Sequence, residues 1–450
     1  MKKRNLLLAV LLQAALLMNF ASCSDDDEEE YFDSKISNLK FLSIENAKNL
    51  YISTDNTAGR AASDTKKIFK ITEDGYTEEV KYLDEDNKEV SLGYTQPCAI
   101  QPVNDEYIFV GFGYGGNSIS SSYLVRKTDG TVFSLANAGN PDKISSSYKN
   151  EKLLKTDKNN NLYFLSYDYS SGSGQKVVKV NLSGIDSLSA TTVSASTDYV
   201  YNFDVDWNGN VIYEGYLTSD SSNAVGRLRK ANGGLANLSE NNACWIGLDG
   251  NIYYKSNDYK NHVYDSETGS YTYYGYPIKK ITVDSSYNVS DEVYGYFGQS
   301  DAYFYQSGSY KLELQNEILI ISASGNDSKI YEVYNETGTP RVVSLDSLSI
   351  KSVTAVASTE NFYYIAGTDK SNNTFLIKVN PTDDSYTNLL PQNDYDVYSF
   401  TASETDGIIF NALRMSDGKK VIGKVGIDGG DVTMIDEESD VQITYLERIN

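Results

Sequence analysis

The chain has 450 residues and a formal net charge of −23, with 62 acidic side chains against 39 Lys and Arg residues. A surface this acidic lacks the clustered Lys and Arg that bind a phosphate backbone, so nucleic acid is excluded as a partner. The single histidine, His262, also excludes most sites that need several histidines or a histidine beside a nucleophile, such as zinc centres and Ser-His-Asp triads.

Residues 1–22 have the three parts of a secretory signal peptide. Positive charges at Lys2–Arg4 precede an apolar stretch over Leu6–Leu17, and small residues precede Cys23. The apolar stretch is too short to cross about 30 Å of hydrocarbon comfortably, and its flanks are those of an export signal. We therefore expect residues 1–22 to be removed, which deletes three positive charges and takes the net charge from −23 to −26.

The cleavage region resembles the lipobox of bacterial lipoproteins, in which small residues precede a cysteine that is acylated and becomes the first residue. Phe20-Ala21-Ser22-Cys23 matches this pattern except at Phe20, where leucine is usual. The resemblance implies that Cys23 carries several acyl chains, palmitate among them, which hold a protein stably in a membrane. The alternative is an ordinary cleaved signal followed by a chance cysteine.

An acidic run follows the cysteine. Ser24–Glu30 reads SDDDEEE, whose carboxylates repel one another and stay solvated, so residues 23–35 are predicted to form a tether. The run is similar to the export signal of surface lipoproteins of Bacteroidota, and Ser24 fits the outer-membrane sorting of Gram-negative lipoproteins. This resemblance implies a protein that is anchored by lipid in the outer membrane and exposed at the cell surface.

The remaining composition is typical of many short strands joined by polar turns. Tyrosine is abundant, with 38 residues against 15 Phe and 2 Trp, whereas proline occurs 7 times; tyrosine favours strands and tolerates half-wet surfaces. Cys98 and Cys244 are the cysteines that follow Cys23. The repeat described next places them on non-adjacent units, so no disulfide is predicted between them, although an exported compartment permits one.

A degenerate repeat runs through most of the chain. Its first element is a short apolar and aromatic strand, found at 49–53, 106–112, 161–167, 210–216, 251–256, 317–323, 361–367 and 407–413. Its second element places a long polar residue between apolar ones and then turns, at 68–75, 123–130, 176–184, 226–234, 278–286, 329–338, 375–384 and 421–430. The polar residue recurs at intervals of 56, 53, 50, 51, 52, 46 and 46 residues, at Lys70, Arg126, Lys179, Arg229, Lys280, Glu332, Lys378 and Lys424. Further apolar stretches before the first element, as at 98–103, and after the second, as at 131–135, make four strands in each unit.

Four strands in about 50 residues are the blade of a β-propeller. One blade is too small to bury its own face, so neighbours must stack against it, and a closed ring leaves only short protected edges. We predict an all-β propeller over residues 36–450 with eight blades. Seven blades are the alternative, because the pattern is swollen by extra tyrosines over residues 253–310. The strand at 441–449 is expected to complete a blade together with residues 38–44.

Two turns carry a weak family resemblance. The segments 206–210 and 247–251, which read DWNGN and GLDGN, resemble turns of NHL-like and quinoprotein-like propellers. The resemblance covers the repeat rhythm of most of the chain and implies the propeller fold. The tryptophan docking signature of quinoproteins is missing. No cofactor is predicted.

Residues 204–209 (DVDWNG) copy the first half of a calcium loop. Calcium needs six to eight oxygen ligands, usually with a bidentate carboxylate at the twelfth position of the loop, and that position is Gly215. Val205 and Trp207 alternate with polar residues as strand residues do. An Asn-Gly hairpin turn therefore explains the segment better than a metal site, and no metal is predicted.

Carboxylates leave an enzyme open as an alternative. A glycosidase needs only a pair of carboxylates that flank the scissile bond, and Asp204 and Glu313 are candidates on strands predicted to line the central channel. Spacing along the chain does not show that any two carboxylates converge. No catalytic residue is assigned.

The first choice of binding surface is a tyrosine-rich segment, 264–276. Its tyrosines are Tyr264, Tyr271, Tyr273, Tyr274 and Tyr276. Exposed aromatic faces stack on sugar rings and anchor protein interfaces. The alternative is an edge strand whose alternating tyrosines pack on their neighbour.

These features predict a non-catalytic surface lipoprotein whose propeller presents a loop face to a glycan or a protein partner. The membrane contact is the lipid anchor alone, because a surface this acidic is repelled by anionic headgroups. A carbohydrate-active hydrolase with paired carboxylates is the first alternative. A structural scaffold subunit of an outer-membrane complex is the second.

Overall fold

The described part of the chain is built almost wholly from β-strands. The computed structural model describes residues 40–41, 44, 47–55, 65–72, 75–84, 86–88, 96–113, 119, 121–135, 154–168, 174–238, 244–247, 251–256, 263–267, 269–272, 276–284, 286, 288–297, 310–314, 317–324, 327–334, 341–345, 348–437 and 441–448. Within these residues the regular non-strand element is the short 3-10 helix η2 (Leu182–Ser187). No helix found there has the length and apolar character that a membrane span needs.

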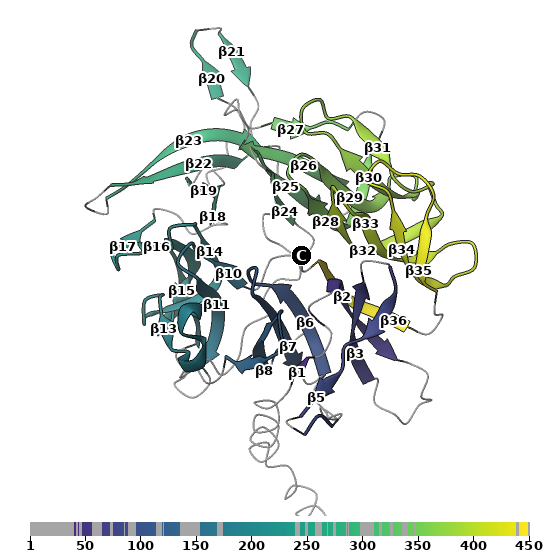
Figure 1. Cartoon of the computed structure of the whole chain (residues 1–450). Helices are drawn as coiled ribbons and strands as arrows, with labels where there is room; N and C mark the ends of the chain where they lie inside the picture. Colours follow the sequence, from purple (N-terminus) through teal and green to yellow (C-terminus); the bar gives the residue numbers. More distant parts are fainter. Residues whose placement is uncertain are drawn as a thin grey trace, which may run out of the picture.

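Eight antiparallel sheets of four strands each are arranged as a ring, so the molecule is an eight-bladed β-propeller (Figure 1). From the axis outward, blade 1 contains β36 (Val441–Arg448), β2 (Ala47–Asp55), β3 (Thr65–Thr72) and β4 (Thr77–Glu79). Blade 2 contains β6 (Gln96–Pro102), β7 (Tyr107–Gly113), β8 (Ser121–Arg126) and β9 (Val132–Ser134). Blade 3 contains β10 (Leu154–Thr156), β11 (Asn161–Asp168), β12 (Gly174–Asn181) and β13 (Ala190–Thr192), and blade 4 contains β14 (Asp198–Val205), β15 (Val211–Leu217), β16 (Asp220–Arg229) and β17 (Leu235–Asn237).

Blades 5 to 8 follow the same order. Blade 5 contains β18 (Cys244–Ile246), β19 (Ile252–Lys255), β22 (Tyr276–Val283) and β23 (Val289–Phe297). Blade 6 contains β24 (Tyr310–Leu314), β25 (Glu317–Ser324), β26 (Asp327–Tyr334) and β27 (Arg341–Val343). Blade 7 contains β28 (Ile350–Ser358), β29 (Tyr363–Asp369), β30 (Thr374–Val379) and β31 (Tyr386–Asn388), and blade 8 contains β32 (Tyr395–Ser403), β33 (Gly407–Arg414), β34 (Lys420–Val425) and β35 (Thr433–Asp436). Every predicted first element is the second strand of a blade and every second element is the third strand. The eight-blade prediction is confirmed.

The ring closes in blade 1, where a strand from the first part of the described chain pairs with a strand from its last part. The C-terminal strand β36 pairs with β2, with Asn49 opposite Arg448. The prediction that residues 38–44 would join this strand is wrong, because β1 (Lys40–Phe41) pairs instead with β5 (Tyr82–Leu83). Phe41 is buried between blades 1 and 2, with its ring centroid 4.7 Å from that of Tyr82. Burial of this side chain holds β1 at the rim of the ring, away from β36.

The hydrophobic core lies between neighbouring blades. Leu50 of blade 1 packs in one buried cluster with Ile100 of blade 2, and Tyr51 of blade 1 packs with Ile409 of blade 8. The second strands are covered on both faces, so β7 is buried at every position and reads as a continuous apolar run (YIFVGFG). Closure therefore rests on packing between blades 8 and 1 as well as on the pairing of β36 with β2.

An insertion in blade 5 explains why the repeat is irregular over residues 253–310. The strands β20 (Val263–Asp265) and β21 (Ser270–Thr272) form a two-stranded sheet of their own, inserted between the second and third strands of the blade. β19 nevertheless pairs directly with β22, from Ile252 opposite Ile281 to Lys255 opposite Ile278. The blade keeps its four strands, and the insertion is a turn that has grown into a hairpin.

Candidate functional sites

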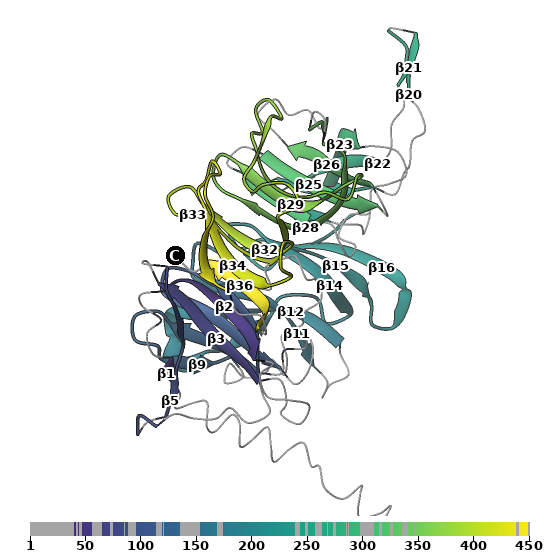
Figure 2. The same ribbon diagram turned by 90° about the vertical axis from the view of Figure 1, so that its right-hand side faces the viewer.

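The turns of the blades lie on two faces of the ring. Because neighbouring strands are antiparallel, the turns between first and second and between third and fourth strands share one face, which we call face A. The turns between second and third strands, and the links to the next blade, share the opposite face, face B. β1 meets the β8–β9 turn on face A, where the Phe41 backbone N donates to the Gly130 carbonyl O at 2.9 Å. The β20–β21 hairpin belongs to face B, and Figure 2 shows it at the far end of the molecule from β1 and β5.

The predicted tyrosine surface is only partly described. Tyr264 of β20 lies directly opposite Tyr271 of β21, and Tyr276 is the first residue of β22. Tyr273 and Tyr274 lie outside the described residues. The hairpin projects from blade 5 (Figure 1), and it is a separate sheet rather than an edge strand of the blade. The binding role of these tyrosines and the alternative, tyrosines of an edge strand that pack on their neighbour, both stay predictions.

Two other tyrosines of the same region belong to the core. Tyr253 and Tyr254 on β19 are both fully buried. The ring of Tyr253 stacks at 6.0 Å on that of Trp245, and the Tyr254 hydroxyl donates to Asp291 Oδ2 at 2.8 Å. Pairs of this kind stabilise the blade and offer nothing to a ligand.

Asp204 lies on an innermost strand, as predicted, but its carboxylate is a structural link. Oδ2 accepts from the Ile246 backbone N of blade 5 at 3.0 Å, and Oδ1 lies 3.3 Å from Lys155 Nζ of blade 3. The side chain is 9% exposed. Glu313 lies on β24, the innermost strand of blade 6. Asp204 therefore ties the inner strands of blades 3, 4 and 5 together, which is not the setting of a carboxylate that meets substrate.

The calcium-like segment forms the predicted hairpin turn between β14 and β15. Oδ1 of Asp206 accepts from the backbone N of Asn208 at 2.9 Å and of Asn210 at 2.7 Å. Gly209 adopts a φ of +83°, which glycine tolerates without a steric cost. The carboxylate is committed to its own turn. In the described residues, no group of three or more potential metal-binding side chains converges.

One prediction for this segment is wrong. Trp207 is not a strand residue but stands at the tip of the turn, with its side chain 70% exposed. The reason is that the Asp206 carboxylate captures the backbone N–H groups that follow it, so the chain reverses before Trp207 can pair in a strand.

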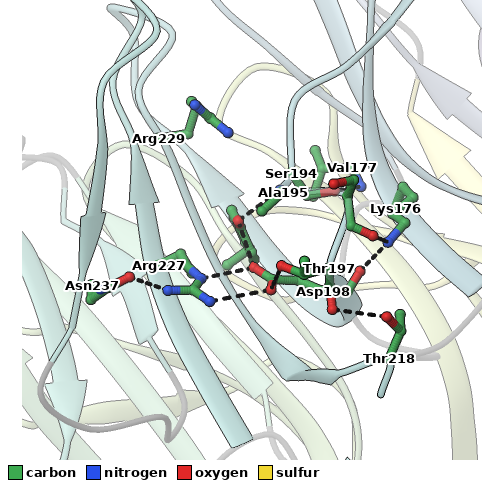
Figure 3. A network of polar contacts seen from close by, with 12 residues as sticks. Lys176, Val177, Ser194, Ala195, Thr197, Asp198, Thr218, Arg227, Arg229 and Asn237 are labelled. Carbon is green, nitrogen blue, oxygen red and sulfur yellow. Dashed lines mark hydrogen bonds and ion pairs between the residues drawn. The ribbon is translucent and has the colours of Figure 1, made fainter. Parts of the chain in front are cut away.

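A polar network of buried and part-buried side chains joins blades 3 and 4 (Figure 3). Asp198, which is fully buried, accepts from Arg227 Nε at 2.8 Å and from the Tyr213 hydroxyl at 3.0 Å. Thr197 Oγ1 donates to the same carboxylate at 2.9 Å. Burial raises the pKa of Asp198, but hydrogen bonds led by that of Arg227 outweigh it and hold the pKa below its ordinary value. The carboxylate stays charged, paired and closed to solvent.

The same network reaches across to blade 3. Lys176 on β12 is buried and donates to the carbonyl oxygens of Ser196 at 2.8 Å and of Asp198. Burial lowers the pKa of this ammonium. The Tyr213 hydroxyl accepts from the Ala195 backbone N at 3.0 Å. These bonds fix the link between the two blades, so we assign the network a structural role.

Asp396, on an innermost strand, is a carboxyl group whose pKa is shifted in the opposite direction from that of Asp198. Asp396 lies on β32, the innermost strand of blade 8, two residues before Tyr398, whose side chain is 42% exposed. Burial raises the pKa of Asp396 and also that of Tyr398, which the nearby Asp396 charge raises further. A carboxyl group that holds its proton more tightly than usual is suited to general-acid chemistry. Sequence reasoning missed Asp396. A register shift between Val397 and Ser399 interrupts the alternation of β32, so spacing along the chain does not show which side of the strand each residue faces.

The two cysteines of the ring lie on separate blades. Cys98 is in β6 of blade 2 and Cys244 in β18 of blade 5. The Cys98 thiol lies 3.5 Å from the Gly111 carbonyl O, and burial raises its pKa to about 11. A thiol of this pKa is protonated at neutral pH and a poor nucleophile. The acylation candidate Cys23 and the single histidine His262 lie outside the described residues.

Comparison with known proteins finds distant likenesses among solved structures. No family model matches the chain, and no curated protein sequence matches it. Among solved structures, the β-propeller domain of the Trilobed protease from Pyrococcus furiosus is 9% identical, with a TM-score of 0.44 over 76% of this chain and 98% of that one. A putative 6-phosphogluconolactonase from Bacteroides fragilis is 11% identical, with a TM-score of 0.41 over 91% and 99%. TolB from Acinetobacter baumannii is 9% identical, with a TM-score of 0.31 over 78% and 81%.

The fold is therefore the level at which the chain is identified. It is a β-propeller, and its eight four-stranded sheets define it as an eight-bladed one. Likenesses this distant say nothing about its ligand, since one propeller scaffold hosts many unrelated functions.

Proposed function

We propose that the protein is a non-catalytic binding lipoprotein of the outer membrane, held by acyl chains on Cys23, which presents face B to a glycan or a protein partner. The leader, the lipobox-like segment and the acidic run support the anchor. The observation that carries the proposal is the separation of two ends of the molecule. The chain enters the ring through β1 on face A, whereas the tyrosine hairpin stands on face B (Figure 2).

The state of the nominated carboxylate supports a binding role over a catalytic one. Asp204 is committed to Ile246 and Lys155, so it serves the ring rather than a substrate. A rigid ring with variable turns is the usual arrangement in which loops bind and the scaffold positions them.

The anchor is tested by labelling. The full chain, expressed in a Gram-negative host, is expected to incorporate an alkyne analogue of palmitate, and Cys23→Ala is expected to lose the label. A variant in which residues 25–30 are replaced by Asn and Gln is the matched control. It should keep the label but lose cleavage by a protease added to intact cells. Labelling of Cys23→Ala would contradict the anchor, and unchanged cleavage of the control would contradict the role of the acidic run.

Binding is tested with protein that lacks residues 1–23. Native gels containing starch, xylan, galactomannan, pectin or yeast mannan detect glycan binding, and a photo-crosslinker placed at Glu267, an exposed hairpin residue, detects a protein partner on intact cells. The double variant Tyr264→Ala/Tyr271→Ala is expected to lose the interaction. Tyr76→Ala, an exposed tyrosine on face A, is expected to keep it. Equal binding by both variants, or no interaction by either method, would contradict the proposal.

A hydrolase is the second candidate, and Asp396 is the observation that favours it. Its raised pKa and its place on an innermost strand are what a general acid requires. Release of reducing ends from the same polysaccharides, abolished by Asp396→Asn, would establish this alternative. Absence of turnover by the unaltered protein would remove it.

A further inference from the structure

We propose that Trp207 is the centre of a second binding site, on face A, and that its ligand is a neutral carbohydrate. Trp207 stands at the tip of the β14–β15 turn with its side chain 70% exposed. A single exposed apolar side chain needs no explanation by itself. Here, however, the turn that carries it is held from both sides by hydrogen bonds to neighbouring turns, and these turns carry exposed polar side chains.

Blade 3 fixes one side of the turn. The Lys158 backbone N donates to the Trp207 carbonyl O at 3.1 Å, and Lys158 Nζ donates to Asn208 Oδ1 at 2.7 Å. Gly209 is packed so closely that a Cβ there would lie 2.7 Å from Asp157 Oδ2 and 3.0 Å from the Tyr163 hydroxyl. The backbone of Trp207 is therefore set by contacts to the neighbouring blade.

Asp157 gives that contact surface its rigidity. Its Oδ2 accepts from the Tyr163 hydroxyl at 2.9 Å and from Asn161 Nδ2 at 2.8 Å, and its Oδ1 accepts from the Asn159 backbone N at 2.8 Å. Burial raises the pKa of Asp157, but these hydrogen bonds outweigh it and lower the pKa overall. Gly209 thus rests on a carboxylate that is itself fully ordered.

The other side of the turn is tied to blade 4 and blade 5. Asn210 Oδ1 accepts from the Ala231 backbone N at 3.0 Å, and Lys230 Nζ donates to the Asp284 carbonyl O at 2.9 Å. Four turns of three blades are joined in this way, and we call them the turn strip: residues 157–160, 206–210 and 230–234, with residues 284, 286 and 288. Trp207 is its large exposed aromatic side chain, and its exposed polar side chains include Asn159, Asn160, Asn208, Asn232 and Ser286.

This arrangement suits a sugar ring. A pyranose has an apolar C–H face, which packs on an aromatic face, and a rim of hydroxyls, which bonds to amide and hydroxyl side chains. Because the turn is already ordered, little conformational entropy is lost on binding. A nucleic acid would bring a phosphate backbone to a chain of net charge −23. A lipid interface favours basic and apolar neighbours, and the two lysines of the turn strip, Lys158 and Lys230, each donate to an oxygen of a neighbouring turn. The exposed polar side chains of the turn strip therefore favour a neutral glycan.

The site goes beyond the proposed function, because it depends on neither the lipid anchor nor the tyrosine hairpin. Trp207 is also its own reporter. The chain has 2 Trp residues, and the other, Trp245, is fully buried with 0% exposure. Collisional quenching by acrylamide will therefore reach Trp207 and spare Trp245.

The test uses the chain without residues 1–23 and the polysaccharides named above. We expect at least one of them to retard the protein in native gels and to protect its fluorescence from acrylamide. Trp207→Ala is expected to weaken that binding roughly 10- to 30-fold without changing the melting temperature, and Trp207→Phe is expected to keep most of the affinity. Tyr76→Ala, the matched exposed aromatic on the same face, is expected to bind as the unaltered protein does. In the tyrosine hairpin double variant, glycan is expected to go on protecting Trp207 from acrylamide, whatever that variant loses through face B.

Three outcomes would overturn the proposal. The first is that none of the polysaccharides protects Trp207 from acrylamide. The second is that Trp207→Ala retains full affinity for them. The third is that phosphatidylcholine vesicles protect Trp207 where glycans do not. The last outcome would identify face A as a membrane contact. Loss of binding in the hairpin variant alone would leave the tyrosine hairpin as the glycan site and remove Trp207 from it.

Discussion

Blades 4 and 5 are neighbours of the same topology that differ in how they are held and decorated. In blade 4 the chain passes from β15, which ends at Leu217, to β16, which begins at Asp220, through two residues. In blade 5 the corresponding turn holds the β20–β21 hairpin. Blade 4 is tied together by buried polar links, such as Asp198 with Arg227. The described core of blade 5 is aromatic, with Trp245 stacked on Tyr253.

The difference teaches that strand pairing carries the ring and that the turn between the second and third strands of a blade is free to vary. β19 and β22 keep a continuous register across the inserted hairpin, and the Ser256 backbone N still donates to the Pro277 carbonyl O at 2.9 Å beyond the last paired residue. We therefore expect substitutions in the contacts that join blade 4 to itself and to blade 3 to change stability, and substitutions in the hairpin of blade 5 to change binding. The predictions below test this division.

The largest effect is expected at the buried ion pair of blade 4. Arg227→Ala leaves the Asp198 carboxylate, which is 0% exposed, without its cation, and such a loss destabilises a fold by about 3–5 kcal/mol. Urea denaturation followed by circular dichroism measures it. Lys88→Ala removes an ion pair whose partners are both 72% exposed and is expected to leave the midpoint unchanged. Equal midpoints for the two variants would show that the network does not hold blade 4.

A smaller effect is expected at the turn that supports Trp207. Gly209→Ala combines a φ of +83° with a Cβ 2.7 Å from Asp157 Oδ2, and we expect a loss of about 2–3 kcal/mol. Gly233→Ala is the matched control, because Gly233 has a φ of +94° but nothing within 4 Å of the added Cβ. It should lose only about 1 kcal/mol. The difference between the two denaturation midpoints isolates the contact with blade 3. No difference would mean that the turn is not pinned.

The sequence predicted the ring well because its signal is local. All eight polar markers, from Lys70 to Lys424, fall on third strands, where period-2 patterning meets a turn. The partner of β36 was not predictable, since both 38–44 and 47–55 are apolar segments. The choice between them depends on the burial of Phe41 against residues of blade 2 that lie much farther along the chain. The exposure of Trp207 was missed for the same reason. The alternation of apolar and polar residues is the same in a strand and in a tight turn. The packing of Gly209 of blade 4 on Tyr163 of blade 3 is a contact between blades, which a local sequence pattern does not show.

The response to acid is expected to come from the polar links as well. The pKa of Asp198 in the folded protein lies below its ordinary value of about 3.9, so its contribution to stability is present above that pH and is lost as the pH falls through the folded-state pKa. Asp157 has the same direction of shift. We expect the free energy of unfolding to fall below about pH 4, and less steeply in Asp198→Asn, which cannot titrate. The exposed Asp428→Asn serves as the control, and identical slopes in both variants would assign the acid response elsewhere.

The smallest effect on stability is expected from the most visible feature. Replacing residues 257–276 by an Asn-Gly turn joins Ser256 to Pro277, which a hydrogen bond already links, in the turn chemistry that two-residue hairpins favour. Because β19 and β22 are already paired up to that point, we expect the melting temperature to stay within a few degrees of the unaltered protein. Binding through face B should be lost, while protection of Trp207 by glycan should persist. A large fall in melting temperature would show instead that the hairpin holds blade 5, and that strand pairing alone does not carry this part of the ring.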